Sequence, residues 1–194
     1  MAINPDSGGR SFVRSGSGDG GDTSLFSGER VRKDSPFIEA VGTLDELGAL
    51  LGLIRTESLD SDNAETLKKI QKKLFDVSAC VINPVPTIPC IENGLRAKTA
   101  RLVSECDVED LESKINRVAA KLTPIHDFLL PGENRVSALL HVARTVARRA
   151  ERRVVALPNL DRTVRPILLA WLNRLSELLF ALARFETPDQ RKDV

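Results

Sequence analysis

Hydrophobic side chains recur every three or four residues through most of the chain, which is the period of an amphipathic helix. A first helix of about four turns is predicted to begin at Thr43, because Thr43-Leu44-Asp45-Glu46 has the form of a capping box. Four more helices are predicted around residues 67–81 and 108–122, from after Pro131-Gly132 to about Leu157, and from about Thr163 to Phe185. No stretch alternates convincingly as a strand would. The chain is therefore predicted to be all-α, a five-helix antiparallel bundle with short or proline-containing connections.

The last predicted helix is apolar on more than one face. Its inward row is expected to include Ala170 and Trp171, and Leu168, Leu172 and Phe180 lie outside that row. A helix of this kind is either central in its bundle or buried at an interface. The pattern favours an oligomer.

The first 42 residues are rich in Gly, Ser and Asp and have no sustained period. We expect a flexible tail over residues 1–14, one folded domain over 15–186, and a polar C-terminal tail over 187–194. Glycines in the stretch from Ser15 to Ser24 would allow backbone N–H groups to surround a polyphosphate, although a flexible tail would have the same composition. Lys33 could add a positive charge to such a site.

Arginines are concentrated in the fourth predicted helix. Arg144, Arg148 and Arg152 recur every four residues and form one stripe, and a second stripe is predicted from Val142, Val146, Ala150 and Val154. Like charges at this spacing repel each other unless an anion lies opposite them. A polyphosphate, a nucleic acid or the carboxylates of a partner would each satisfy the planar guanidinium groups.

Composition narrows the class of protein. The formal net charge is +1, so the arginines form a local cluster and not a general nucleic-acid surface. Three cysteines without CxxC spacing predict neither a disulfide framework nor a zinc site, and they favour a reducing compartment, the cytoplasm or the mitochondrial matrix. No apolar run is long enough to span a bilayer, so no membrane association is expected. His126 and His141 are interpreted as structural, and no metal bound by protein side chains is expected.

Six blocks of sequence, in order, resemble one known family. They are Ser17-Gly18-Asp19-x-Gly21-x-Thr23, Gly28-Glu29-Arg30-x-x-Lys33-Asp34, Glu39-Ala40-Val41-Gly42-Thr43-x-Asp45-Glu46-Leu47, Phe128-x-Leu130-Pro131-Gly132, Arg144-x-x-x-Arg148-Arg149-Ala150-Glu151-Arg152-Arg153 and Leu172-Asn173-Arg174-Leu175-Ser176. Together they resemble the PduO-type ATP:cob(I)alamin adenosyltransferases over about residues 12–186. Each block alone is a modest signal, but the ordered set is specific.

The resemblance implies a homotrimeric bundle with active sites between subunits, where the 5′-deoxyadenosyl group of ATP passes to cob(I)alamin and Mg²⁺ bridges phosphate oxygens. It implies catalytic roles for Asp45, Arg144 and Arg148, with Asp45 and Arg144 as an interfacial ion pair, and a corrinoid-contacting role for Phe128, which would otherwise be read as a core residue. A cobalamin-dependent acceptor enzyme is a further implied partner. The implied ATP-binding residues are Ser15, Gly16, Ser17, Gly18, Gly21, Thr23, Ser24, Lys33, Arg148, Arg149, Glu151, Arg152 and Asn173.

The chain also departs from the family pattern. Ser17 and Gly20 stand where the family usually has threonine and lysine, which predicts weaker ATP binding, and one extra residue precedes Asn173. Two alternatives stay open. The first is a helical module without catalytic activity that binds RNA or an acidic partner, and the second is a corrinoid carrier or chaperone. The lack of aromatic residues among the arginines disfavours RNA.

Overall fold

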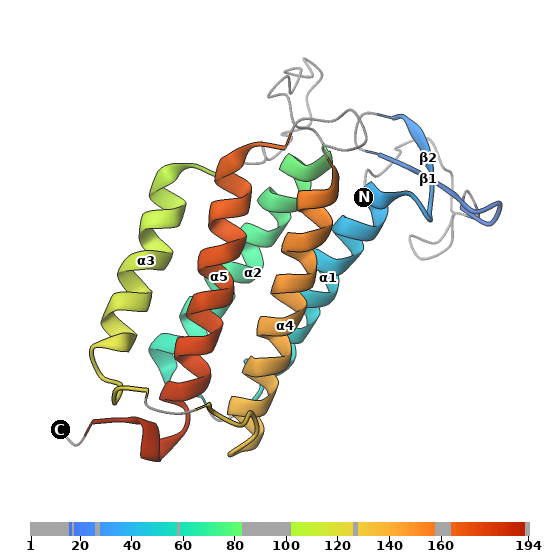
Figure 1. The fold of residues 1–194 in the computed structure, drawn as a ribbon. Helices are drawn as coiled ribbons and strands as arrows, with labels where there is room; N and C mark the ends of the chain where they lie inside the picture. The colour runs from blue at the N-terminus through green and yellow to red at the C-terminus, as the bar shows by residue number, and fades with distance from the viewer. Residues whose placement is uncertain are drawn as a thin grey trace.

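Five helices form one bundle, as predicted (Figure 1). The computed structural model describes residues 16, 18–25, 28–57, 59–82, 102–125, 128–157 and 164–192. Consecutive helices run in opposite directions, while α3 and α5 lie side by side and run in the same direction. The helices are α1 (Pro36–Ile54), α2 (Ser61–Ile82), α3 (Glu105–Ala119), α4 (Arg135–Ala156) and α5 (Pro166–Phe185).

The start of α1 differs from the prediction by seven residues. Ser35 is its N-cap, with a side-chain oxygen that accepts a hydrogen bond from the Ile38 N–H at 3.4 Å, and Pro36 occupies the first turn. The capping-box interpretation of Thr43 is therefore wrong. Thr43 is buried inside the helix, where its hydroxyl donates to the Glu39 carbonyl oxygen at 2.7 Å. Asp45 consequently lies in the middle of α1, where the helix dipole does not stabilise a carboxylate as it does in the first turn.

A small hairpin precedes the bundle, so the expectation of no strand is also wrong. Strands β1 (Asp22–Ser24) and β2 (Arg30–Arg32) pair antiparallel, with Thr23 opposite Val31. The hairpin projects beyond the N-terminal end of α1, outside the bundle (Figure 1). Three residues per strand are too few to produce a readable alternation of hydrophobic and polar side chains.

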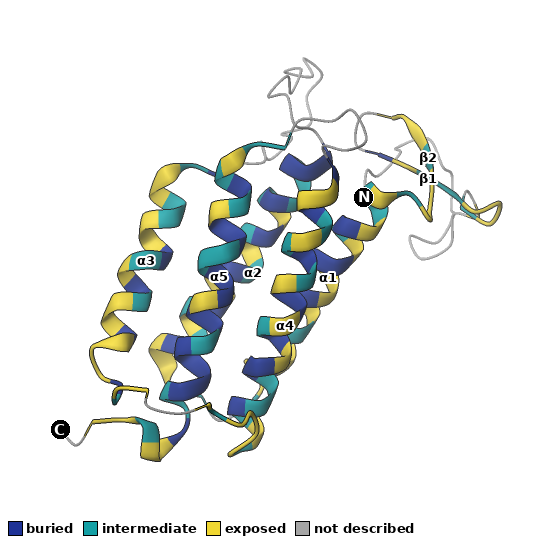
Figure 2. Ribbon diagram, in the orientation of Figure 1, coloured by how far each residue is buried: buried dark blue, intermediate teal, exposed yellow. Residues whose placement is uncertain are grey.

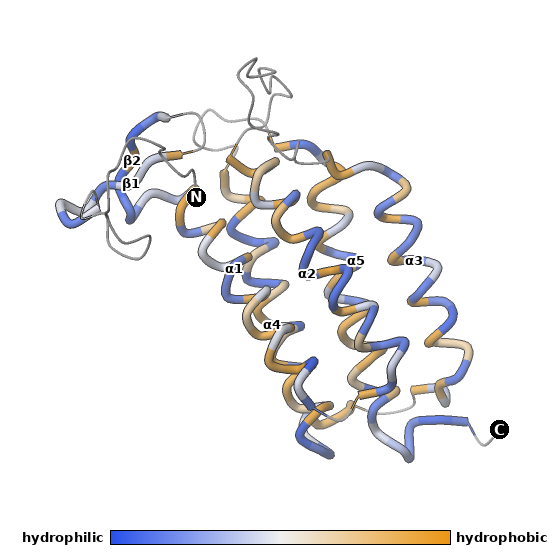
Figure 3. Tube along the Cα trace, turned by 180° about the vertical axis from the view of Figure 1, so that it is seen from behind, coloured by the Kyte–Doolittle hydropathy of each residue, from blue (hydrophilic) through white to orange (hydrophobic). Residues whose placement is uncertain are grey.

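Helix α5 is the centre of the core. It contacts α2, α3 and α4, and its buried side chains include Leu168, Trp171, Leu172 and Leu179 (Figure 2). Of the two alternatives that the sequence left open for this helix, a central or an interfacial one, α5 is central in its bundle, but Ala170 is exposed and not inward-facing. Because the extra apolar face of α5 is covered within the chain, that face no longer argues for an oligomer. Viewed from behind, hydrophobic and hydrophilic stretches alternate along the helices, as expected for helices that bury one face (Figure 3).

By length and composition alone, α5 is apolar enough to cross a membrane, although the sequence has no uninterrupted apolar run of that length. More than half of the apolar window, 56%, is buried inside the bundle. Packing in a bundle core accounts for this composition.

The chain after α5 folds back onto the bundle. A 3-10 helix, η2 (Pro188–Gln190), follows Thr187, whose side chain is buried. Beyond it, Arg191 pairs with Leu122 in an isolated antiparallel bridge. This segment therefore lies beside the connection between α3 and α4.

Candidate functional site

The glycine loop and Lys33 come together as predicted. Gly16 and Gly21 have positive φ values of 67° and 88°, which side chains other than glycine rarely adopt. The Gly21 carbonyl accepts from the Lys33 N–H at 2.8 Å, and a Cβ on Gly18 would lie 3.0 Å from the Lys33 ammonium nitrogen. The ammonium group is therefore held directly against the loop backbone.

Other predicted residues of this loop are more peripheral or cannot be placed. Thr23 is half-buried in β1, and the exposed Ser24 hydroxyl accepts from Arg30 at 3.4 Å. Ser15 and Ser17 lie outside the described residues. The described part of the loop thus supplies backbone groups and one ammonium group for an anion.

The arginines of α4 divide into two sets, and one set faces acidic residues on α1. Arg149 forms an ion pair with Glu46, and Arg153 forms one with Glu39. Arg153 also donates to the buried Thr43 hydroxyl at 2.7 Å. These two guanidinium groups are neutralised inside the subunit, which relieves part of the repulsion that the sequence predicts.

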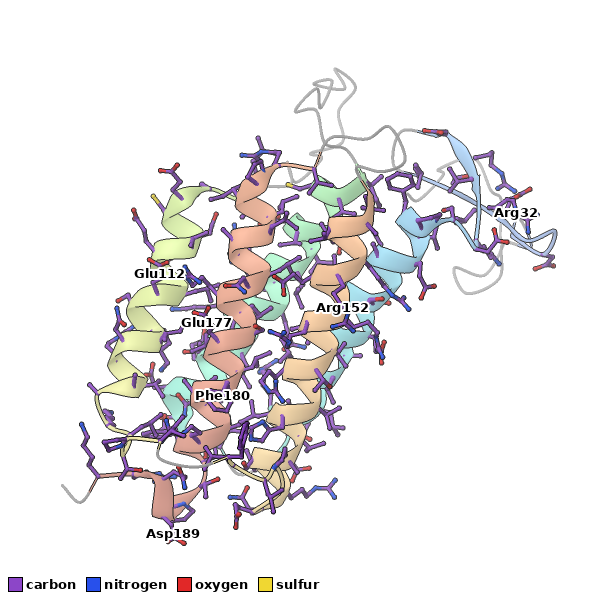
Figure 4. The ribbon with its side chains drawn as sticks, viewed as in Figure 1. Arg32, Glu112, Arg152, Glu177, Phe180 and Asp189 are labelled. Atoms are coloured by element: carbon purple, nitrogen blue, oxygen red, sulfur yellow. The ribbon has the colours of Figure 1, made fainter. Side chains whose placement is uncertain are left out.

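The second set, Arg148 and Arg152, has no acidic partner among the described residues. Figure 4 labels Arg152 on α4. Both side chains are exposed, and Arg152 donates only to the Arg148 carbonyl oxygen at 3.2 Å. Half-buried Glu151 lies in the same helical turn. These two exposed guanidinium groups are available to an external anion.

The register of α4 and α5 places Arg148 level with Asn173. The rings of His141 and Phe180 meet edge to face, with centroids 5.9 Å apart. Seven residues, or two turns, separate His141 from Arg148 on α4 and Phe180 from Asn173 on the antiparallel α5. The side-chain oxygen Oδ1 of Asn173 accepts a hydrogen bond from Arg174 at 2.8 Å, which leaves the side-chain amide N–H groups for a ligand. Two residues far apart in the sequence are thus brought to one level of the same bundle face.

Asp45 and Arg144 do not meet within the chain. Asp45 is exposed, whereas Arg144 is half-buried and donates to His141 Nδ1 at 3.4 Å. The ion pair between Arg149 and Glu46 sets the register of α4 on α1, and it puts Arg144 about 9 Å further along the axis than Asp45, at 1.5 Å per residue. Within the described part of the chain, Asp45 and Arg144 therefore form no ion pair with each other.

The predicted valine stripe of α4 is only partly buried. Val146, Ala150 and Val154 are buried, but Val142 is 49% exposed, which corrects its assignment to that stripe. Counted over two turns from the pair between Arg149 and Glu46, Val142 lies level with Leu53 of α1, which is 45% exposed. An apolar pair thus lies on the outer face shared by α1 and α4.

Phe128 is fully exposed, so its interpretation as a core or staple residue is wrong. Leu130 nearby is 83% exposed, and Ile125 is also exposed. His126 lies outside the described residues. Apolar side chains gathered in a connection and left uncovered indicate a surface that contacts a large apolar ligand or a partner.

His141 is buried beneath this end of α4. Burial lowers the pKa of the imidazole below its ordinary value of 6.5, and the positive charge of Arg144 lowers it further. The hydrogen bond from Arg144 requires an unprotonated Nδ1, which agrees with a neutral imidazole. His141 is therefore a buried, neutral side chain, and its structural role stays a prediction.

The free energy of unfolding is expected to fall as the pH drops below 6.5, because the unfolded chain binds a proton at His141 that the native state resists. One such group contributes a slope of at most about 1.4 kcal/mol per pH unit. Urea titrations at intervals between pH 7.5 and 5 would measure it. In His141→Gln the slope should be shallower than in the parent chain, and an unchanged slope would assign the titration elsewhere. The paired carboxyls of Asp62 and Asp107 have lowered pKa values and contribute only at more acidic pH.

Two features of this region were not predicted from the sequence. Glu39 and Thr43 are the α1 partners of Arg153, and Leu53 with Val142 is the exposed apolar pair. The spacing of four between Glu39 and Thr43 was a readable sign that both share a helical face. No local sequence pattern indicated that α4 is the helix that this face of α1 contacts.

Comparison with known proteins agrees with the family that the sequence resembles. A family model described as cobalamin adenosyltransferase matches residues 13–186. The chain is 42% identical over 172 residues to the corrinoid adenosyltransferase PduO of Salmonella typhimurium, covering 89% of this chain and 48% of that protein. It is 38% identical over 174 residues to a corrinoid adenosyltransferase of Citrobacter freundii, covering 89% of this chain and 94% of that protein. The chain spans about half the length of the PduO relatives from Salmonella and Citrobacter.

A solved structure has a similar fold. It is a histidine-for-phenylalanine variant of the PduO-type ATP:corrinoid adenosyltransferase from Lactobacillus reuteri, complexed with cobalamin and ATP. The TM-score is 0.78 at 28% identity, and the match covers 92% of this chain and 94% of that chain.

Proposed function

The chain belongs to the cobalamin adenosyltransferase family, and from this we propose that it transfers the 5′-deoxyadenosyl group of ATP to the cobalt of cob(I)alamin. Adenosylcobalamin and triphosphate are the products. One observation carries the proposal: Arg148 keeps an exposed guanidinium group level with Asn173 and Arg152 keeps one a turn further along α4, while Arg149 and Arg153 are neutralised by α1. A triphosphate is an anion that satisfies this arrangement.

The reaction needs alignment and charge stabilisation more than activation by a base. The cobalt(I) electron pair attacks the ribose C5′ and forms a cobalt–carbon bond, while the C5′–oxygen bond breaks and its electron pair leaves with the triphosphate. Arg148 and Arg152 from α4, with Lys33 from the loop, stabilise the charge on the leaving group. Phe128 and Leu130 bind the apolar face of the corrin and hold the cobalt in line.

Two subunits are needed to complete the site. The glycine loop projects beyond α1, whereas Arg148 and Asn173 lie on the α4–α5 face. We therefore propose a homotrimer in which the loop of one chain covers the α4–α5 face of the next. Exposed Leu53 and Val142 supply apolar contact area, and Asp45 of one subunit pairs with Arg144 of its neighbour.

Mg²⁺ would bind together with the phosphates of ATP and would neutralise part of the charge on the leaving triphosphate. No group of three His, Cys, Asp or Glu side chains suited to a metal gathers in the described ranges, and Mg²⁺ commonly binds through substrate phosphates and water. The proposed domain covers residues 15–186. The proposed compartment is a reducing one, the cytoplasm or the mitochondrial matrix, where an acceptor enzyme would take the product.

An assay with chemically reduced cobalamin tests the proposal. With ATP and Mg²⁺ present, the cobalt(I) absorbance should disappear and adenosylcobalamin and triphosphate should form in equal amounts. A carrier without catalytic activity would bind corrinoid and produce neither product. Strong RNA retention with a steep salt dependence, and no loss of cobalt(I), would favour the polyanion-binding module.

A further inference from the structure

The segment that follows α5 is tied to the start of the α3–α4 connection by backbone hydrogen bonds. The Thr123 N–H donates to the Gln190 carbonyl oxygen at 3.0 Å, and the Lys192 N–H donates to the Lys121 carbonyl oxygen at 3.0 Å. Between these two bonds, Leu122 and Arg191 form the isolated bridge, and Leu122 is buried. The two segments thus form a short two-stranded contact at one end of the bundle.

Arg184 reinforces this contact from inside. Its side chain is 8% exposed and donates to the Thr123 carbonyl oxygen at 2.6 Å and to Gln190 Oε1 at 3.3 Å. Both acceptors are neutral, so the guanidinium group serves to hold two backbone segments together. Arg191 then stacks over the ring of Phe185, with its guanidinium carbon 4.6 Å from the ring centroid.

The far end of the same connection rests on the same segment. The Asn134 amide, at the N-cap of α4, donates to the Glu186 carbonyl oxygen at 2.7 Å. The buried Thr187 hydroxyl lies 3.2 Å from that of Ser137 in the first turn of α4. Leu130 lines a small cavity together with Arg184 and Gln190. The C-terminal segment therefore supports the connection before and after Phe128.

We propose that residues 187–192, with Arg184, position the connection that carries Phe128 and Leu130 and thereby determine the affinity for the corrinoid. This rests on the proposed function, which makes those two side chains the corrinoid-contacting surface. Exposed apolar side chains on a connection without helix or strand bind well only if their backbone is already ordered. Without residues 187–192, corrinoid binding would have to supply that ordering, whereas the glycine loop at the other end of the bundle would be unaffected.

The test is a chain that ends at Glu186 and therefore lacks residues 187–192. Its KM for cob(I)alamin is expected to rise by about tenfold or more, because fixing even one backbone residue on binding costs about that factor. Its KM for ATP should stay within about twofold. Amide hydrogen exchange at Thr123 should become faster, and this readout does not depend on activity.

Point variants of the full chain separate positioning from general destabilisation. Arg184→Met and Gln190→Ala should raise the KM for corrinoid, and Arg184→Lys should restore part of the affinity by keeping a donor near Thr123. Asp189→Ala is the matched control, since Asp189 is exposed and its side chain forms no hydrogen bond or ion pair with the other described residues. If the shortened chain does not fold, the KM for corrinoid of the full-length Gln190→Ala variant tests the proposal instead.

Two negative results remain distinguishable. A parent chain that produces no adenosylcobalamin would contradict the proposed function. Amide hydrogen exchange at Thr123 in Gln190→Ala would then still show whether the C-terminal segment orders the α3–α4 connection. An active parent whose shortened and Gln190→Ala forms keep the parental KM for corrinoid would overturn the positioning role.

Discussion

Arg148→Ala is expected to lower turnover by about 10²-fold without altering the fold. Its guanidinium group is exposed and has no acidic partner among the described residues, so removing it breaks no contact that holds the bundle together. It lies level with Asn173, where the leaving triphosphate is proposed to bind. Losing one preorganised contact to a charge that develops in the transition state typically costs this factor.

The matched control for this variant is Arg117→Ala. Arg117 is an exposed arginine on α3, a helix that carries none of the residues proposed for the site, and its removal makes the same change in net charge. Turnover, KM for ATP and the thermal midpoint should be measured in both variants. A turnover near the parental value in Arg148→Ala, or an equal loss in Arg117→Ala, would contradict a specific role for Arg148.

The helices were predictable because each buries one face at a regular period. Leu67, Ile70 and Leu74 mark α2 in this way, and all three are buried. The start of α1 was misplaced because the capping-box pattern at Thr43 outweighed the Ser35-Pro36 pair. That pair has a preferred N-cap residue followed by proline in the first turn, which is the stronger local sign.

The site was predictable only in part, because its charges depend on which helix faces which. A stripe of arginines in sequence does not reveal that Arg149 and Arg153 face α1 while Arg148 and Arg152 do not. Nor does the phenylalanine at 128 reveal its exposure, since the same residue before a helix usually packs against that helix. In both cases the missing information is long-range packing, which no local pattern contains.

Asp45→Ala is expected to reduce turnover by an amount similar to that for Arg148→Ala, although Asp45 has no role in holding its own subunit together. The carboxylate is exposed in the middle of α1, and Arg144 lies about 9 Å away along the axis of the same chain. We propose that their pairing joins two neighbouring subunits. Losing one partner would leave the other charge unpaired at an interface, which is costly. Turnover and the mass of the assembly in solution are the measurements.

Mixing two inactive variants distinguishes a pair between subunits from a pair within one. In a closed ring, Asp45 of each subunit meets Arg144 of the next, so each interface takes one residue from each chain. An Arg144→Ala subunit still supplies Asp45, and an adjacent Asp45→Ala subunit still supplies Arg144. Equal co-expression should therefore restore about a quarter of the interfaces. If the mixed trimers remained as inactive as either parent variant, the two residues would not form an interfacial pair, and the loop would have to meet Arg148 by another arrangement.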